Sequence, residues 1–492
     1  MANHGTFHRF QTVADPEGCC RLLVLRHRAR GASESKPGPG FTRRVRVRQI
    51  RNLLLVILCA VFIALAAADT QAANIASAQS GNWDAGTTWI GGVPPIAGDN
   101  VTIASSHTII VAVDVAAATI TIAENASGTN GIFVNAGARL VTSGSITMTA
   151  PTSGTSTIGV GAGTLNAASI TIPGSATAGR NCVVSVSTGI ITVTGSIAFT
   201  GTAAQAQFIS TDAGTVNIAG NFENGGTLVT GGTGTINFNG SAAQTLGAYT
   251  TYNNVAINNT SGGVTLTGTT TIGGDLAVMT GNFSVGPYAL TVSGSTSVNG
   301  TLSITSATGA KTFTNNVIIS SGGLWNNASG NAAVSIAGNL QNDGNFIAGT
   351  GVYTFAGAAK AIGGVNAVTI PNLTVTGTVA NNGSLNVSTA LAGSGTLTNS
   401  AYAMLNIGGT SGITTLTASA GPNTVNYSGA AQTVKPTTYH HLTLSGSGAK
   451  TITNVSTING NLTLAGTCSA TTAIATTIGG SLSVGANASL TA

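Results

Sequence analysis

Short apolar stretches alternate residue by residue with polar residues along most of the chain. From about residue 74 onward, Val, Ile and Leu recur at every second position over three to five residues, and each stretch ends at Gly, Asn, Ser or Asp. This alternation predicts short β-strands separated by turns, and no segment keeps the longer period of an amphipathic helix. Clear examples are residues 101–103, 119–122, 191–193, 264–266, 373–375 and 442–444.

Two segments with a 118-residue offset are nearly identical. Ile-Ala-Gly-Asn-Phe at 218–222 recurs as Ile-Ala-Gly-Asn-Leu at 336–340, and a second phrase at 237–245 recurs at 426–433. Such self-similarity is typical of stacked supersecondary units. The 118-residue spacing predicts a higher-order period built from several coils.

Three architectures use short strands: sandwich domains, propellers and solenoids. Sandwiches need longer strands and large core aromatics, whereas aromatic residues make up 5% of this chain. A propeller needs a blade signature, which is not found. The sequence therefore predicts an all-β fold, a right-handed parallel β-helix (β-solenoid) with an N-terminal capping segment. A folded β structure is favoured over disorder because 42% of the residues are hydrophobic.

The basic charge of the chain belongs to its first 68 residues. They carry eleven Lys and Arg against three acids, whereas the remainder carries six against nine, so the main body offers no basic surface for nucleic acid. A basic run at 43–51 precedes an apolar stretch at 53–67 and a small-residue site, the pattern of a secretory signal peptide. The stretch is short for a membrane span. Cys59 lies inside it, where no lipoprotein signal surrounds it.

The sequence predicts three parts. Residues 1–68 form a basic leader and signal peptide, residues 69–125 an N-terminal capping module, and residues 126–492 a β-solenoid repeat region that we expect to be truncated at its C-terminus. Trp83 and Trp89 lie in the second part. They fit a cap over the first coil, and stacking on a sugar is the alternative.

These phrases resemble those of bacterial β-strand-repeat surface proteins, a group that overlaps the filamentous-haemagglutinin and autotransporter-passenger type of β-helix. The resemblance covers residues 205–490. It implies a cell-surface or extracellular location and an adhesive or structural role, without a catalytic apparatus.

Acidic residues are too sparse to predict an enzyme. Past Glu124 the only acids are Asp212, Glu223, Asp275 and Asp343. Asp212 and Glu223 are near enough in sequence to share a neighbourhood, although turn positions explain both. We therefore predict no catalytic residues and no cofactor.

Metal binding is also not predicted. Asp84, Asp99 and Asp114 are evenly spaced in the sequence, and with Asn100 they offer oxygen ligands for Ca²⁺, but Asp is a common turn residue. The tandem pair His440 and His441 is expected to point to opposite faces of a strand, which disfavours joint ligation.

Two further patterns lead to negative predictions. Cys182 and Cys468 are expected to stay unbridged and inert, because they are far apart in a stacked array. Thr-x-Thr pairs would favour an ice-binding ladder, but their spacings share no period, so no ladder is predicted. These pairs begin at Thr119, Thr147, Thr192, Thr265, Thr374 and Thr451.

Together these observations predict an exported, non-catalytic, repetitive bacterial surface protein with an adhesive or structural role. The alternative is a carbohydrate-active or carbohydrate-binding β-helix protein. The expected partners are glycans and host, matrix or neighbouring-cell surface components, with no nucleic acid. Contact with a membrane is expected only through the export signal or a missing C-terminal anchor. The expected location is secreted or cell-surface.

Overall fold

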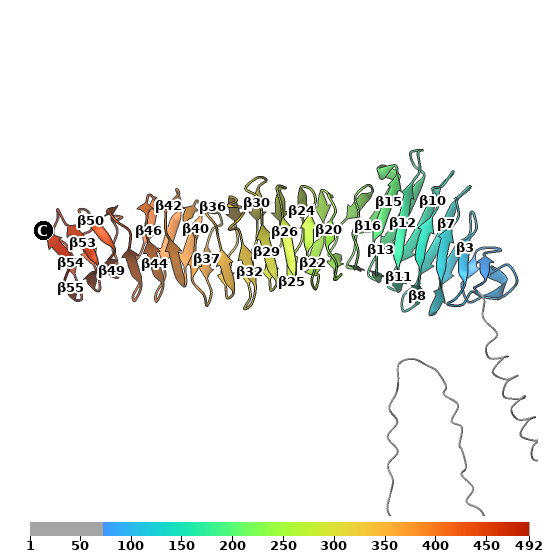
Figure 1. Cartoon of the computed structure of the whole chain (residues 1–492), viewed down its shortest axis with the longest axis horizontal. Coiled ribbons are helices and arrows are strands. Elements are labelled where there is room, and N and C mark those ends of the chain that lie inside the picture. The colour runs from blue at the N-terminus through green and yellow to red at the C-terminus, as the bar shows by residue number, and fades with distance from the viewer. Residues whose placement is uncertain (1–71, 492) are drawn as a thin grey trace, which may run out of the picture. The chain divides into compact units, whose positions relative to one another are not determined.

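The computed structural model describes residues 72–491, which form a β-solenoid of roughly 20 turns (Figure 1). The prediction of an all-β parallel solenoid is confirmed, since every ladder between its strands is parallel. The only helical elements of the described residues are the short 3₁₀ turns η1 (Gly86–Thr88) and η2 (Ala203–Gln205). The hand of the coil stays a prediction, and the predicted signal peptide lies outside the described residues.

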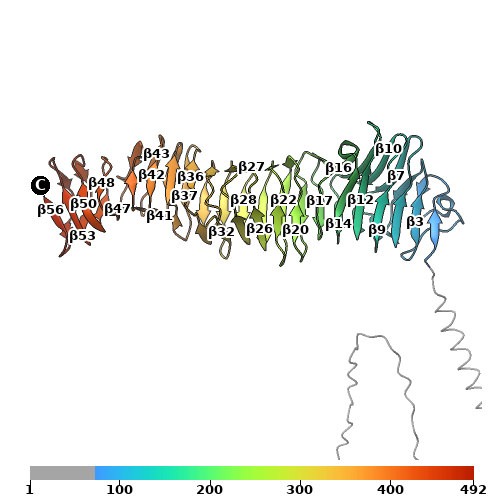
Figure 2. The ribbon, with the colours of Figure 1, turned by 45° about the horizontal axis from the view of Figure 1, so that its top comes forward.

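Most turns contribute one strand to each of three faces, which run side by side along the solenoid (Figures 1 and 2). Face 1 starts with a six-stranded sheet, continues through the bridge residue Phe222 into a second six-stranded sheet and ends in a seven-stranded sheet. The first sheet contains β1 (Asn74–Ala76), β3 (Asn100–Ile103), β6 (Thr119–Ile122), β9 (Ser145–Met148), β12 (Ser169–Gly174) and β15 (Ile197–Gly201). The second runs from β20 (Gln244–Leu246) to β35 (Asn345–Ile347), and the third from β38 (Val368–Thr369) to β55 (Leu482–Val484).

Face 2 is built from sheets of seven, nine and four strands. The first contains β2 (Gly81–Asn82), β4 (Thr108–Val111), β7 (Thr129–Val134), β10 (Thr155–Val160), β13 (Asn181–Val186), β16 (Ala206–Ser210) and β18 (Thr227–Thr230). The second runs from β21 (Thr251–Tyr252) to β45 (Thr410–Ser411), and the third from β48 (Gln432–Thr433) to β56 (Ser489–Thr491). Face 3 is a fifteen-stranded sheet from β5 (Val115–Ala117) to β46 (Thr415–Thr417), followed by β51 (Thr457–Ile458) and β54 (Thr477–Ile478).

The period-two alternation in the sequence places one apolar side chain in the core and the next residue on the surface. In β3, β6 and β9, for example, the second and fourth residues are fully or almost fully buried. These inward side chains stack coil upon coil into one continuous hydrophobic core. Neighbouring coils thus stabilise one another, as expected for a quasi-one-dimensional repeat fold.

Coil length varies because the corners absorb insertions. On neighbouring coils Thr424 is the register partner of His441, whereas the longer coil that starts at Ile170 returns to register only at Ile197. The predicted boundary at residue 125 lies inside the stack, since β6 on one side of it pairs directly with β9 on the other.

The predicted 118-residue period is wrong. Ile218 ends β17 (Thr215–Ile218) on face 3, whereas its counterpart Ile336 ends β33 (Val334–Ile336) on face 2. The two copies are therefore separated by five coils and two further strands, which is not a whole number of coils. The repeated phrase is a corner motif: an apolar strand end, two or three small or polar residues with a glycine, and the next buried side chain. It serves two different corners, and at both its glycine lies against the backbone of the preceding coil, where a Cβ at Gly220 would be 2.4 Å from Gly195 C and one at Gly338 2.1 Å from Asn315 C.

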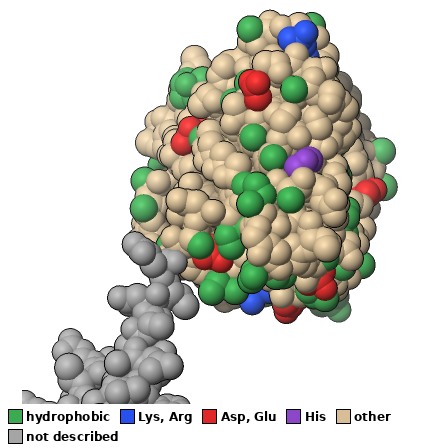
Figure 3. All heavy atoms as spheres, turned by 90° about the vertical axis from the view of Figure 1, so that its right-hand side faces the viewer, with side chains coloured by type: hydrophobic (Ala, Val, Ile, Leu, Met, Phe, Trp, Pro, Cys, Tyr) green, Lys and Arg blue, Asp and Glu red, His purple; other side chains and the backbone are tan. Residues whose placement is uncertain are grey.

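The first coil is covered by a small tryptophan cluster. Trp83 and Trp89 are both buried, their rings meet edge to face at 5.0 Å, and Trp89 Nε1 donates to the Trp83 carbonyl over 2.6 Å. Buried rings leave no free face for a sugar, so their geometry fits the predicted cap. Figure 3 looks onto this end of the solenoid, where hydrophobic side chains are scattered over the surface and the charged side chains lie apart from one another.

A candidate binding groove on face 2

The widest stretch of the solenoid lies on face 2 near its N-terminal end. Strands β7, β10 and β13 each have six residues and pair over their full length, whereas most strands of the described residues have three or four. Longer strands give this face room for outward side chains in more than one column. One of these columns runs through Ile110, Phe133, Gly159, Ser185 and Ile209 in direct register.

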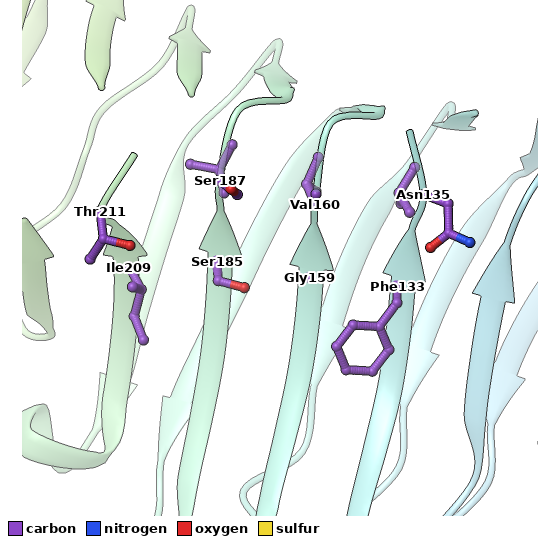
Figure 4. Close-up of a pocket in the computed structure, with 11 residues that line it drawn as sticks. Phe133, Asn135, Gly159, Val160, Ser185, Ser187, Ile209 and Thr211 are labelled. Carbon is purple, nitrogen blue, oxygen red and sulfur yellow. The ribbon is translucent and has the colours of Figure 1, made fainter. Parts of the chain in front are cut away.

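A shallow groove of about 360 Å³ follows this column across four coils (Figure 4). Phe133 and Ile209 are apolar side chains at its two ends, and Asn135, Ser187 and Thr211 lie where the strands turn into the next corner. Since coils repeat at ~4.8 Å, the four strands span about 14 Å along the solenoid axis.

The groove depends on a glycine beside the aromatic ring. A Cβ atom at Gly159 would lie 2.6 Å from Phe133 Cδ1, so only glycine lets the ring lie over the neighbouring strand. The ring is half-buried as a result, and one side of it remains accessible. Aromatic rings held in this way are rigid apolar platforms for a ligand.

Neutral polar groups line the rest of the groove, away from the ring. The side chains of Asn135, Ser185 and Thr211 make no hydrogen bond to other described residues, and Ser187 Oγ donates to the Asp212 carboxylate over 2.6 Å. The groove therefore combines an apolar platform with free hydroxyl and amide groups. This combination suits a neutral ligand that has both an apolar face and hydroxyl groups.

Sequence reasoning missed this groove because it did not single out Phe133 or the strand that contains it. The signal is a break in the alternation: Ile132, Phe133 and Val134 are three apolar residues in succession, and only the first and third are buried. In a solenoid, whose strands bury one face only, the middle residue of such a run points outward.

The two acids considered for catalysis are not brought together. Asp212 is exposed at the corner between faces 2 and 3, whereas Glu223 follows Phe222 on face 1. The other two acids hold turns, because Asp275 Oδ1 accepts the Ser295 N–H at 2.7 Å and Asp343 Oδ1 accepts the Val365 N–H at 2.8 Å. The four carboxylates thus lie at separate corners.

The residues considered for Ca²⁺ are also separate. Asp99 is buried, and its two carboxylate oxygens accept the N–H groups of Ala73 and Ile96 at 3.0 and 2.8 Å, whereas Asp84 and Asp114 are exposed turn residues. Within residues 72–491 no group of three or more His, Cys, Asp or Glu side chains is placed to hold a metal ion.

The predicted orientation of the histidine pair toward opposite faces is wrong. His440 and His441 pack edge to face with ring centroids 4.4 Å apart. Only His441 belongs to a strand, β49 (His441–Leu444), so the alternation of strand side chains does not apply to His440. His441 Nδ1 accepts the Asn461 N–H at 3.0 Å, and burial together with His440 lowers the pKa of His441.

Both cysteines of the described residues are free and buried, as expected. Burial raises the pKa of Cys182 to about 12, so its thiol stays protonated and unreactive at neutral pH.

Comparison of the chain with protein-family models, curated proteins and solved structures finds no match. Among the described residues, no helix has the length and apolar character needed to cross a membrane.

Proposed function

We propose that the chain is an exported, non-catalytic bacterial surface protein with a structural or adhesive role. The observation that supports this best is the distribution of charge. The described residues contain six Lys and Arg and eight Asp and Glu, scattered along the solenoid, while its faces carry mostly hydroxyl, amide and small side chains. An extended, neutral, stacked array suits display and contact more than acid–base chemistry, which needs ionisable groups held together.

A second candidate function is carbohydrate binding, favoured by the groove around Phe133. A half-buried aromatic ring offers a surface for the apolar face of a sugar, while Asn135, Ser185 and Thr211 supply neutral hydrogen-bonding groups along the groove. The partner proposed for this groove is a neutral glycan.

The test combines location and binding. The full chain is expressed with its leader in a bacterial host, and surface exposure is measured by labelling intact cells. Purified full chain is then applied to glycan and matrix-protein arrays. We expect surface or secreted protein, and glycan binding that falls at least about tenfold in Phe133→Ala, because an aromatic anchor at the centre of a site carries much of the binding energy.

Tyr402→Ala is the matched control, since this ring is 86% exposed and lies far along the chain from the groove. Equal binding by wild type and Phe133→Ala would exclude the groove as the glycan site. Binding to neither array would leave a purely structural layer, and a chain retained in the cytoplasm would contradict the proposed export.

A further inference from the structure

Four consecutive coils of face 1 present the same outward pattern. In each, a buried Val or Ile lies between two outward polar residues. Seven of these eight outward residues are Ser or Thr and the eighth is Asn100, and we name the set the hydroxyl array. They belong to Asn100-Val101-Thr102 in β3, Thr119-Ile120-Thr121 in β6, Ser145-Ile146-Thr147 in β9 and Ser169-Ile170-Thr171 in β12.

The array forms two columns in register. Thr102 pairs with Thr121, Thr121 with Thr147, and Thr147 with Thr171, so four threonines stack along the axis. In the second column Asn100 pairs with Thr119, and Ser145 pairs with Ser169.

The sequence-based prediction that no threonine ladder exists is therefore wrong. The steps from one of these threonines to the next differ in length along the chain, so no single period is visible in the sequence. The corners between these strands differ in length, and strand pairing nevertheless brings the four threonines into register.

The array has two regular spacings. Neighbouring coils are ~4.8 Å apart along the axis, and outward residues two apart on one strand are separated by ~6.7 Å. β-Branched threonine has few side-chain rotamers, so its hydroxyl and methyl groups are held in place without added ordering. Figure 2 shows β3, β9 and β12 following one another near the N-terminal end of the solenoid.

The threonine hydroxyls of the first column are free. Thr102, Thr121, Thr147 and Thr171 make no side-chain hydrogen bond to other described residues, whereas Thr119 Oγ1 donates to Asn100 Oδ1 at 2.7 Å. The four strands contain no charged residue. Hydration at these positions is therefore set by hydroxyl and methyl groups at regular spacing, without the shells that charged groups would orient.

We propose that the hydroxyl array is an ice-binding surface. Its two spacings are close to the two repeats of oxygen positions on a prism face of hexagonal ice. Water held on the hydroxyls then joins the growing crystal as part of its lattice. This inference goes beyond the proposed surface role and does not involve the groove on face 2.

Face 2 provides an internal comparison. Seven hydroxyl residues stack there in one unbroken column, but five of their seven strands have only two or three residues, with one outward side chain each. The one-column ladder consists of Thr251, Thr271, Thr291, Thr312, Ser335, Thr354 and Thr374. Binding to an ice face requires a match both along the solenoid axis and along the strands. We therefore expect this ladder, which has only the spacing along the axis, not to bind ice.

The experiment measures inhibition of ice recrystallisation and partitioning of the full chain into a slowly growing ice body. We expect wild type to do both. Thr121→Tyr with Thr147→Tyr should lower the activity at least about tenfold, because bulky rings break the lattice at the centre of the surface. Thr291→Tyr with Thr312→Tyr is the matched control and should keep full activity.

Circular dichroism and thermal unfolding establish that both variants fold, as expected for tyrosine at outward strand positions. Absence of ice activity in wild type overturns the proposal, as does equal loss in the two double variants. Binding to crystalline cellulose without binding to ice also overturns it, and would assign the array to an ordered polysaccharide. None of these outcomes bears on the glycan test at Phe133.

Discussion

Buried amide and ammonium groups tie neighbouring coils together at single residues. Gln432 is buried, its Nε2 donates to the carbonyls of Ile407 and Gly409 at 2.8 Å, and its Oε1 accepts the Gly429 N–H at 2.8 Å. Gln244 plays the same part in the earlier copy of this phrase. In both copies of the repeated Ala-Gln-Thr, the glutamine side chain thus provides hydrogen-bond partners for backbone groups at a corner.

Lys450 continues this arrangement one coil further. Its buried Nζ donates to the carbonyls of Gly429 and Ala430 and to Gln432 Oε1, each at 2.7 Å. No carboxylate takes part in this cluster. Desolvation lowers the pKa of Lys450, because burial of the charged ammonium group is unfavourable. Its three hydrogen bonds offset this unfavourable burial.

We predict that Lys450→Met lowers the free energy of unfolding by about 2–4 kcal/mol, because three buried oxygens lose their donor. Lys450→Gln should cost less, since the chain itself uses Gln at such corners. The folded-state pKa is below the ordinary lysine value of 10.5. The unfolded chain therefore binds the proton more tightly, and wild type should gain stability relative to Lys450→Gln as pH rises toward that value.

Denaturant unfolding of wild type and both variants at several pH values checks this. Equal stability of Lys450→Met and wild type would show that the three oxygens find other partners.

At the scale of single elements, close approach of strands dictates a few glycines. Gly131 lies in the middle of β7 with φ of +142°, and a Cβ atom there would lie 1.8 Å from the Thr157 carbonyl oxygen. Gly137, at the following turn, also has positive φ (+76°) but has nothing within 4 Å of its Cβ position. Comparing substitutions at these two glycines therefore distinguishes the cost of a steric contact from the cost of backbone strain.

We predict that Gly131→Ala destabilises the solenoid by about 2–4 kcal/mol, because contact with a paired strand adds to the strain of the backbone. Gly137→Ala should cost about 1 kcal/mol from backbone strain alone. Thermal unfolding followed by circular dichroism measures both. Similar melting temperatures for the two variants would mean that β7 shifts to accept the methyl group.

Over the whole described molecule, the stack is interrupted at two levels of face 2. Between β18 and β21 the interior is filled by an aromatic cluster around Phe222, which contacts Phe199, Phe208, Tyr249 and Tyr252. Between β45 and β48 no ladder forms, and a cavity of about 660 Å³ is lined by residues of both strands. Tyr427 and Tyr439 hold this level from inside through hydroxyl bonds to each other and to the Lys435 backbone.

We predict that the amides of Ser411 and Thr433 exchange hydrogen faster than those of paired strands, because no backbone hydrogen bond joins these two residues across the cavity. Thr271, whose strand pairs on both sides, is the reference. Hydrogen–deuterium exchange at residue resolution checks this, and slow exchange at Ser411 and Thr433 would show that the level is closed in solution.

Much of the fold was predictable from the sequence, whereas the two candidate surfaces, the groove and the hydroxyl array, were not. Alternation around residues such as Ile120 and Leu442 identifies strands locally, because burial acts on each side chain separately. The hydroxyl array and the groove at Phe133 depend on which strands pair. Which residues pair depends on the length of each corner, and the sequence alone does not show where one corner ends and the next strand begins.

By itself, the sequence determined that this protein is an all-β, weakly charged solenoid, because strand alternation, turn residues and composition are local properties. Only the tertiary structure decided that the 118-residue repeat is a corner motif, that His440 and His441 touch, and that Thr102, Thr121, Thr147 and Thr171 stand in line. The reason is physical: hydrogen bonds between coils align strands, while the number of residues in each corner is free to vary.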